Sequence, residues 1–501
     1  MKKFGFKKAG IAALCACAAL TPCLTACGGG GSDDDLPDDP GVYGGITSTT
    51  ITVGNTAGTT GALAAIGAPF NYGIEAAFWE YNNKGGFTGK YNNKDVSGLK
   101  VALKTYDDMG NAANTVTYTD RLIHDDEVFA IVGNFGTYGV AANLDILKEE
   151  GVPMVYAAAG NEEMANATAK GVDRFIFPVQ PITSSEGRVL IQRAFAPASK
   201  GGLGATKVGV IGESTNDASN FIISGIKAEM NKLTSAQKNN VVFQEASDTT
   251  NNFGPEAAAI KQAGCDVVIV TTTASYKQVV TALMGAGYTS DNCKILTTYN
   301  NATTTIFDKT TGTGDTAVSS FDTSFAPIID ATYSQSWLDI SSTTYVYNKE
   351  TPLCAAYKLL GSTLGGLYDN GVPKFNEEYW DVAEVLYDFG LAQASSIPTG
   401  YNSFTLSYNS YALAGYIAGN LFCSGLEALN GAGLELTRRN YVDAMEKAPI
   451  KLPMSGNISF QDGRRLGIDA FALSVNEGNN DGGVTTSRVV HGFTTLDEFR
   501  G

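Results

Sequence analysis

The feature that most constrains the fold is a regular alternation of strand-like and helix-like segments between residues 48 and 300. Apolar runs such as "LKVALKTYDD", "VFAIVGN" and "VPMVYAAAG" alternate with amphipathic runs such as "GIEAAFWEYNN" and "GVAANLDILKEEG". This alternation is typical of βαβ units, in which helices cover both faces of a parallel sheet. Strands written as continuous apolar runs fit a sheet that is buried on both sides. The pattern predicts an α/β fold.

A second series of the same kind follows the first. It begins after "FIFPVQPITSSEG" with the strand-like "KVGVIGES" and runs to "CKILTTYN". A chain of 501 residues also exceeds what one core supports, since single cores stop growing at ~250–300 residues. We therefore expect two α/β units in series, with a crossover near residues 178–183.

The chain after residue 300 is less regular. The stretch 303–405 starts loop-like and low in charge, and no pattern in it indicates a role. Near the C-terminus, "GNISFQDGRRLGIDAFALSV" predicts a hairpin that turns at "QDGRR".

The N-terminus has the pattern of an export signal. Residues 1–26 combine a lysine-rich head with the apolar run "AGIAALCACAAL", which is too short to span a bilayer as a helix. The stretch "LTAC" that ends at Cys27 resembles a bacterial lipobox, whose cysteine is diacylated and becomes the first mature residue. The alternative is ordinary cleavage nearby, with Cys27 a bystander.

The next segment, residues 27–47, is rich in glycine and aspartate and predicts a flexible acidic tether. Two acyl chains give stable anchoring where one does not. No later run of 18 apolar residues occurs. We therefore expect the body to lie outside the cytoplasm, in the periplasm or at the cell surface. Its contact with a bacterial membrane would be the lipid on Cys27 alone.

The charge balance argues against nucleic-acid binding. The chain has 35 basic and 51 acidic residues, a formal net charge of −16. Loss of the four leader lysines leaves 31 basic residues and a net charge of −20. Such a surface repels nucleic acid and anionic lipid head groups.

Motifs for catalysis or metal binding are missing from the sequence. There is no GxSxG, HExxH or GxxxxGK[ST], and only His124 and His491 supply imidazoles. We expect no enzyme activity, no metal and no cofactor.

Four cysteines remain in the mature body beyond Cys27: Cys265, Cys293, Cys354 and Cys423. An even count in an exported chain permits two disulfides. Cys265 and Cys293 each open an apolar strand-like run, and the starts of neighbouring parallel strands lie close together. We expect that pair, and Cys354 with Cys423 by elimination.

Taken in order, these segments resemble the leucine/isoleucine/valine-binding branch of the type I periplasmic binding proteins of ABC transporters. The resemblance rests on "TTGALAAIG…GIEAAFWEYNNKGGFTGK", "YDDMGNAANTV…RLIHDDEVFAIVGNFGTYGVAA", "EEGVPMVYAAAGNEEM" and "NNFGPEAAAIKQAGCDVVIV". It covers residues 48–300 segment by segment and 405–475 more loosely.

The resemblance implies two doubly wound parallel-sheet lobes joined by a three-strand hinge, with the ligand in the cleft between them. Open α/β sheets bind ligands outside the carboxyl ends of their strands, which agrees with a cleft site. Carried onto this chain, lobe I would comprise 48–179 and 300–447, and lobe II 180–299 and 448–490.

The resemblance also implies a set of ligand-contacting residues in lobe I. Thr137 stands where the family commonly has a hydroxyl that grips a ligand carboxylate, and the helix that follows offers free N–H groups. The other reading is that Thr137 only caps that helix. The family often has Thr or Ser where this chain has Gly160, a departure that weakens the carboxylate clamp. The full set in lobe I is Thr60, Ile66, Gly136, Thr137, Tyr138, Ala158, Ala159 and Gly160.

In lobe II the expected ligand residues are Asp217, Thr273, Tyr276 and Tyr299. Asp217 stands at a family tyrosine, where a carboxylate receives an ammonium group or caps the next helix. The acid that holds the amino group in valine-type binders falls near Thr250, which is uncharged. Tyr299 lies at the expected second hinge.

The function implied is a solute-binding lipoprotein that delivers a small polar solute, such as an amino acid, an amide or a small carboxylate, to ABC permease subunits. A ligand sensor that feeds a sensor kinase or chemoreceptor has the same fold, and fold alone does not separate the two. A surface lipoprotein without a ligand is the third alternative.

Overall fold

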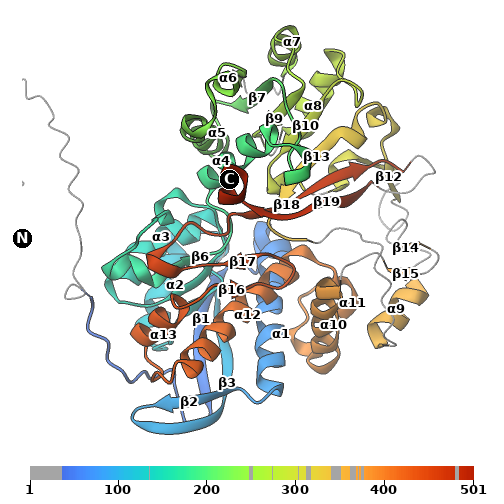
Figure 1. The fold of residues 1–501 in the computed structure, drawn as a ribbon. Helices are drawn as coiled ribbons and strands as arrows, with labels where there is room; N and C mark the ends of the chain where they lie inside the picture. Colours follow the sequence, from blue (N-terminus) through green and yellow to red (C-terminus); the bar gives the residue numbers. More distant parts are fainter. Residues whose placement is uncertain are drawn as a thin grey trace, which may run out of the picture.

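Two separate β-sheets divide the chain into two α/β lobes, which lie one above the other in Figure 1. The structure is a computed structural model that describes most of the chain from residue 36 onward. It covers residues 36–501 apart from 135, 248–251, 273–274, 303, 312–317, 340–350, 361–367, 370–371, 374–376 and 480–484.

The sheet of lobe I has six strands in the order β2-β3-β1-β4-β5-β6. Its apolar strands run parallel and are covered on both faces, as their continuous apolar sequences predict. Only β2 is antiparallel, because it forms a hairpin with β3. The strands are β1 (Thr50–Ala57), β2 (Phe87–Tyr91), β3 (Lys94–Asp107), β4 (Ile131–Val132), β5 (Met154–Ala157) and β6 (Ile176–Pro178).

The helices of lobe I include the longest in the described structure. They are α1 (Ala64–Asn83), α2 (Ala112–His124), α3 (Thr137–Glu149), α10 (Glu377–Ala392), α11 (Ser403–Ser407), α12 (Ser410–Gly431) and α13 (Arg438–Met445). Helices α1 and α12 pack with their backbones in direct contact, because Gly73 faces the carbonyl oxygen of Ala412 and Gly415 faces that of Phe70. A Cβ at either glycine would clash with backbone.

Among the described residues, α12 alone is long and apolar enough to cross a bilayer. Of its most apolar 18-residue window, 72% is buried inside the protein. It is therefore a core helix of lobe I.

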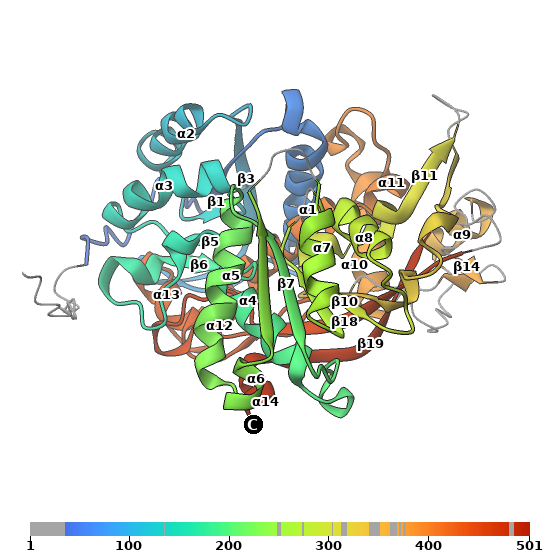
Figure 2. The same ribbon diagram turned by 90° about the horizontal axis from the view of Figure 1, so that it is seen from above.

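The sheet of lobe II has seven strands in the order β19-β18-β13-β10-β9-β7-β8. The strands are β7 (Val208–Glu213), β8 (Val241–Ala246), β9 (Val267–Val270), β10 (Lys294–Thr297), β13 (Thr332–Ser336), β18 (Ala470–Glu477) and β19 (Thr486–Thr495). The helices are α4 (Thr183–Phe195), α5 (Asp217–Glu229), α6 (Ser235–Lys238), α7 (Gly254–Gln262), α8 (Tyr276–Gly285) and α14 (Leu496–Arg500). Figure 2 shows α4 and α5 side by side, and their contacts agree.

The topology corrects the expected lobe boundaries. Residues from 300 onward were assigned to lobe I, but β13 pairs in parallel with β10 and so extends the sheet of lobe II. The chain enters lobe I only after Ser336. The second lobe also continues past residue 490, through β19 and α14, to Arg500.

The expected C-terminal hairpin is also wrong. The strand β18 pairs with β13 and with β19, both antiparallel, and not with the residues before "QDGRR". Those residues form β17 (Asn457–Ile458), which pairs with β16 (Ile450–Lys451).

The stretch 303–405 divides between the lobes. The hairpin of β11 (Asp308–Thr311) and β12 (Val318–Phe321) precedes β13 in lobe II. In lobe I, α10 packs against α1 and buries Trp380 completely. Between β13 and α10 the sequence also forms the helix α9 (Pro352–Leu360) and the short strands β14 (Tyr368–Asp369) and β15 (Val372–Pro373).

The end of the predicted tether is docked on lobe I, so the tether is shorter than expected. We call residues 39–46 the N-terminal strap. Tyr43 is only 4% exposed, and its backbone N–H donates to the hydroxyl of Tyr91 over 3.0 Å. The guanidinium of Arg438 lies 4.8 Å from the centre of the Tyr43 ring, and Phe129 meets the same ring edge-on at 5.4 Å. Residues 1–35, including Cys27, lie outside the described residues.

The two expected disulfides are not formed, because all four cysteines of the body are free and buried. Pairing of Lys294 with Val267 places Cys293 opposite Asp266, so Cys293 and Cys265 are one residue out of register. Burial raises the pKa of Cys265 to about 11 and that of Cys293 to about 12. Cys354 and Cys423 are buried in the core of lobe I.

Candidate functional site

The crossovers between the lobes place the strand ends of both sheets near one boundary. The first crossover joins β6 to α4, and the second follows β13. The third returns to β18, and on the way the N–H of Ile468 donates to the carbonyl of Val179 over 3.0 Å. The N–H of Asp339 likewise donates to the carbonyl of Met454 over 2.7 Å. These bonds tie the crossovers to each other.

In lobe I the loops that follow β1 and β3 are held together by Asp107. Its carboxylate accepts from the hydroxyl of Thr60 and from the backbone N–H groups of Thr59 and Met109, the latter two over 3.0 Å. Burial raises the pKa of Asp107, but these hydrogen bonds outweigh it and hold the pKa below its usual value. Thr60 is therefore positioned by a charged partner, and Ile66 follows, half-buried, in α1.

The loop after β4 leads into an open helix end. Gly136 precedes α3 with φ of 92°, a conformation that favours glycine, and no side chain caps the helix. Within the described residues, the Thr137 hydroxyl and the N–H groups of Thr137 and Tyr138 have no hydrogen-bond partner. Thr137 is exposed and so is not the cap of α3. An uncapped helix N-terminus with a free hydroxyl suits an anion.

Tyr138 is fixed beside this helix end. Its hydroxyl donates to Asp108 over 3.1 Å, and Asp108 also accepts from the hydroxyl of Thr115 over 2.9 Å. Burial, and then the Asp108 charge, raise the pKa of Tyr138. The ring lies so close to Gly136 that a Cβ there would be 2.7 Å from it.

The loop after β5 completes the lobe I side. The N–H of Ala158 donates to the carbonyl of Asn134 over 3.0 Å, and Ala159 is buried beside it. The carbonyl of Gly160 accepts from the hydroxyl of Thr183 over 2.8 Å. A Cβ at Gly160 would lie 2.7 Å from the carbonyl oxygen of Pro181, so the first crossover leaves no room for the family's hydroxyl residue.

The structure thus brings together the expected lobe I residues at adjoining strand ends. One further residue, which no sequence pattern indicated, joins this loop to lobe II. The carboxylate of Glu162 accepts from the backbone N–H of Ser184 over 2.7 Å and from its hydroxyl over 2.8 Å. It therefore caps α4 from the other lobe.

The expected lobe II residues are less consistent with a ligand site. Asp217 is exposed at the start of α5, but the cap of that helix is Asn216, which accepts from the N–H of Ser219. Tyr276 is only 1% exposed, and its ring contacts Phe307 in the core of lobe II. Thr273 lies outside the described residues.

Tyr299 is half-buried after β10, not at a crossover, and packs against a core cluster that contains residues of both lobes. Its backbone N–H donates to the carboxyl of Glu186 over 2.7 Å. A second acidic side chain, Glu213, ends β7 and accepts from the hydroxyl of Ser275 over 2.6 Å. Neither glutamate was singled out by the sequence.

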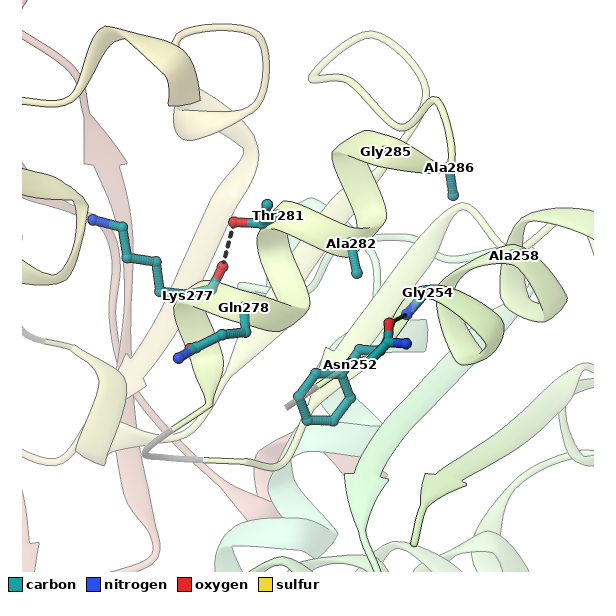
Figure 3. Close-up of a pocket in the computed structure, with 10 residues that line it drawn as sticks. Asn252, Gly254, Ala258, Lys277, Gln278, Thr281, Ala282, Gly285 and Ala286 are labelled. Carbon is teal, nitrogen blue, oxygen red and sulfur yellow. Dashed lines mark hydrogen bonds between the residues drawn. The ribbon is translucent and has the colours of Figure 1, made fainter. Parts of the chain in front are cut away.

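A groove of about 650 Å³ lies between α7 and α8, as Figure 3 shows. Ala258 and Ala282 line it from the two helices, with Asn252 at one end and Gln278 beside it. No expected ligand residue lines this groove. Among the described residues, no three His, Cys, Asp or Glu side chains lie close enough to hold a metal ion.

Comparison with known proteins identifies the family. The sequence profile described as periplasmic binding protein matches residues 50–339, more than half of the chain. The chain belongs to the periplasmic binding protein family. The resemblance to the leucine/isoleucine/valine-binding branch and the type I fold are confirmed.

Curated relatives of this periplasmic binding protein match over part of their length. A Leu/Ile/Val-binding protein homolog 3 of Brucella melitensis is 33% identical over 124 residues, which cover 25% of this chain and 30% of that protein. A Leu/Ile/Val-binding protein homolog 7 of Brucella abortus is 27% identical over 228 residues, which cover 45% of this chain and 53% of that protein. The matches thus span about half or less of these relatives.

A solved structure extends the likeness of fold to almost the whole periplasmic binding protein. An ABC transporter substrate-binding protein from Sphaerobacter thermophilus aligns with a TM-score of 0.54 and 18% identity. The alignment covers 90% of this chain and all of that one. At this identity the likeness concerns the fold.

Proposed function

We propose that this chain is the extracytoplasmic solute-binding lipoprotein of an ABC transporter, which captures a small polar solute by closure of its two lobes. The observation that carries the proposal is the open N-terminus of α3. The hydroxyl of Thr137 and the N–H groups of Thr137 and Tyr138, which have no partner among the described residues, lie together on lobe I. A carboxylate is the group that such donors bind best.

The neighbouring contacts explain how that donor set is kept in place. Asp108 holds Tyr138, Asp107 holds Thr60, and Asn161 donates to the carbonyl of Thr137 over 3.3 Å. Donors that are fixed before binding lose little conformational freedom when the solute arrives.

The solute class follows from what the two lobes offer. Lobe I offers donors for a carboxylate or an amide oxygen. On lobe II, Asp217 and Glu213 lie near strand ends and offer acceptors for an ammonium or amide nitrogen. The curated relatives are named for leucine, isoleucine and valine, which carry both groups. We therefore place the solute among amino acids, amides and small carboxylates.

Membrane attachment belongs to the same proposal. Cys27 would carry the lipid, and the segment that follows it would lead to the docked N-terminal strap. The partners would be the permease subunits that receive the solute. Replacing Cys27 with Ser should release the chain from the membrane fraction and abolish incorporation of labelled fatty acid. Retained incorporation in that variant would contradict the assignment.

Solute binding is tested by a thermal-shift screen of amino acids, amides and small carboxylates. A solute at a hundredfold excess over its Kd should stabilise the chain by ~2.7 kcal/mol. Thr137→Ala should remove most of the shift given by a carboxylate. Thr117→Ala is the matched control, because Thr117 is exposed on α2 and bonds only to the carbonyl of Ala113. Equal shifts in both variants would contradict the site.

A further inference from the structure

A buried carboxyl group lies where the two lobes meet. Glu186, in the first turn of α4, is only 1% exposed. One of its oxygens, Oε1, accepts from the backbone N–H of Tyr299 over 2.7 Å and from Nε2 of Gln335 over 3.3 Å. Gln335 stands near the end of β13, just before the second crossover. The carboxyl therefore links the start of α4 to the end of two strands.

No cation in the described structure balances this carboxyl. Within the part of the chain that the structure describes, no Lys, Arg or His lies within ion-pair distance of Glu186. The buried carboxylate of Glu229 on the neighbouring helix α5 is different, because it pairs with Arg500 over 2.6 Å and accepts from Gln192 over 2.8 Å. An unpaired buried carboxylate is costly, and the usual response is to take up a proton.

Residues that adjoin Glu186 are bonded to lobe I. Ser184, two residues earlier, is bonded to Glu162 of lobe I, and Thr183 is bonded to the carbonyl of Gly160. On the other side, Tyr299 packs against a core cluster that contains residues of both lobes. Rotation of the lobes about the crossovers would withdraw these covers and admit water to the carboxyl.

The charge state of Glu186 then depends on the arrangement of the lobes. In this structure burial raises the pKa of Glu186 to about 7, and the bonds from Tyr299 and Gln335 counter that effect only in part. The other titratable group at the carboxyl is the Tyr299 phenol, whose pKa is raised by burial and then by Glu186. Glu162 faces the same helix end, whereas Glu229 and Arg500 pair with each other at the far end of α4. Water would lower the pKa of Glu186, so opening releases a proton and closure takes one up.

We propose that Glu186 is a positioning residue that couples lobe closure to the uptake of one proton, so that the closed arrangement is favoured in mildly acidic surroundings. The inference rests on the proposed function in one respect: proton-coupled closure is useful to the protein only if the closed lobes retain a solute. Its test needs no solute. A failure of solute binding and a failure of proton coupling are therefore distinguishable.

The experiment measures the distance between the lobes in the full chain without added solute, with the proton as the only probe. Nitroxide labels at Thr117→Cys on α2 and Ala218→Cys on α5 report this distance, because both positions are exposed. The chain without these two substitutions measures background labelling of the buried cysteines. We expect the ratio of closed to open molecules to fall about three- to tenfold from pH 6 to pH 8, since one pKa unit corresponds to a tenfold change.

Two substitutions decide the role of Glu186. Glu186→Gln keeps an acceptor for the Tyr299 N–H but cannot ionise, so the distance should no longer depend on pH in this range. Glu229→Gln is the matched control and should keep the dependence. Gln335→Leu removes a donor to the carboxylate, which should move the midpoint to higher pH and serves if Glu186→Gln does not fold. A pH-independent distance in the unsubstituted chain, or an unchanged dependence in Glu186→Gln, would overturn the proposal.

Discussion

The carboxylate of Glu162 in lobe I caps the first helix of lobe II, because it accepts from both the backbone N–H and the hydroxyl of Ser184 over 2.7 and 2.8 Å. A cap usually comes from the residue just before the helix. Here that residue is Ile182, which has no such group, and the cap crosses the boundary between the lobes. The bond therefore ties the start of α4 to the loop that carries the candidate ligand residues.

The interlobe cap gives the first prediction. Glu162→Ala should lower the free energy of unfolding by roughly 1–2 kcal/mol, the usual cost of a lost N-cap. Glu163→Ala is the control, because Glu163 is the exposed neighbour and makes no hydrogen bond to α4 among the described residues. Urea unfolding followed by circular dichroism measures both. An equal loss in the two variants would show that the bond to Ser184 contributes nothing specific.

Two buried carboxyl groups, Glu186 and Glu229, should give opposite pH dependences of the free energy of unfolding. The pKa of Glu186 is raised from 4.5 to about 7, so the folded state binds the proton more tightly and stability falls as pH rises from about 4.5 to 7. The full difference is of the order of 3 kcal/mol. Glu186→Gln should therefore raise the melting temperature at pH 8 relative to the unsubstituted chain and change it little at pH 4.5.

Glu229 should behave in the opposite way. Burial raises its pKa, but the bonds from Arg500 and Gln192 outweigh burial and hold the pKa below its usual value. Its contribution to stability is present above the unfolded pKa and is lost as pH falls. Glu229→Gln should lower the melting temperature at pH 7, with a smaller effect near pH 3. Parallel pH profiles for the two variants would contradict both assignments.

The order of strands and helices up to residue 300 was predictable from the sequence, because each βα unit carries its own period and its own turn residues. The position of β13 was not predictable in this way. Its pairing with β10 in parallel and with β18 in antiparallel orientation joins segments far apart in the chain, and β13 itself has the polar sequence "TYSQS". For this reason the predicted boundary between lobe II and lobe I at residue 300 was wrong.

The candidate site was predictable in part. The start of α3 at Thr137 was predictable because a strand, a glycine turn and a helix start are local signals. The ligand role of Thr137 rests on the family resemblance and stays a prediction. The burial of Tyr276 was not predictable, because a helix start at a strand end does not tell which way the side chain faces. The sequence did not indicate Glu162 or Glu186. Their hydrogen-bond partners are distant in sequence and come close only in the folded chain: Ser184, Tyr299 and Gln335.

The docked strap gives a prediction about the N-terminal segment. Composition alone predicted a tether through residue 47, yet Tyr43 is buried against Arg438 and Phe129. Tyr43→Ala should cost ~3 kcal/mol, typical of truncating a buried aromatic ring, and should expose the strap to proteolysis. Val42→Ala is the control, since Val42 is 53% exposed. Mass spectrometry of a limited digest locates the new cleavage, and its absence would contradict docking.

The contact between α1 and α12 depends on the absence of a side chain at Gly415. Gly415→Ala should destabilise lobe I by 2 kcal/mol or more (about the cost of overpacking a core), because the new Cβ would clash with the carbonyl of Phe70. Gly431→Ala lies in the same helix with no atom within 4 Å of the new Cβ. It should be neutral or stabilising by roughly 0.5–1 kcal/mol. Chemical unfolding of the two variants tests the difference directly.

The most direct test of solute capture is the thermal shift of the full chain with a panel of amino acids, amides and small carboxylates, measured beside Thr137→Ala and Thr117→Ala. At least one carboxylate or amide solute should raise the melting temperature of the unsubstituted chain and of Thr117→Ala. The same solute should have little effect on Thr137→Ala, because the open end of α3 has then lost its hydroxyl. If no solute in the panel shifts the unsubstituted chain, or if all three proteins shift alike, the proposed binding site is wrong.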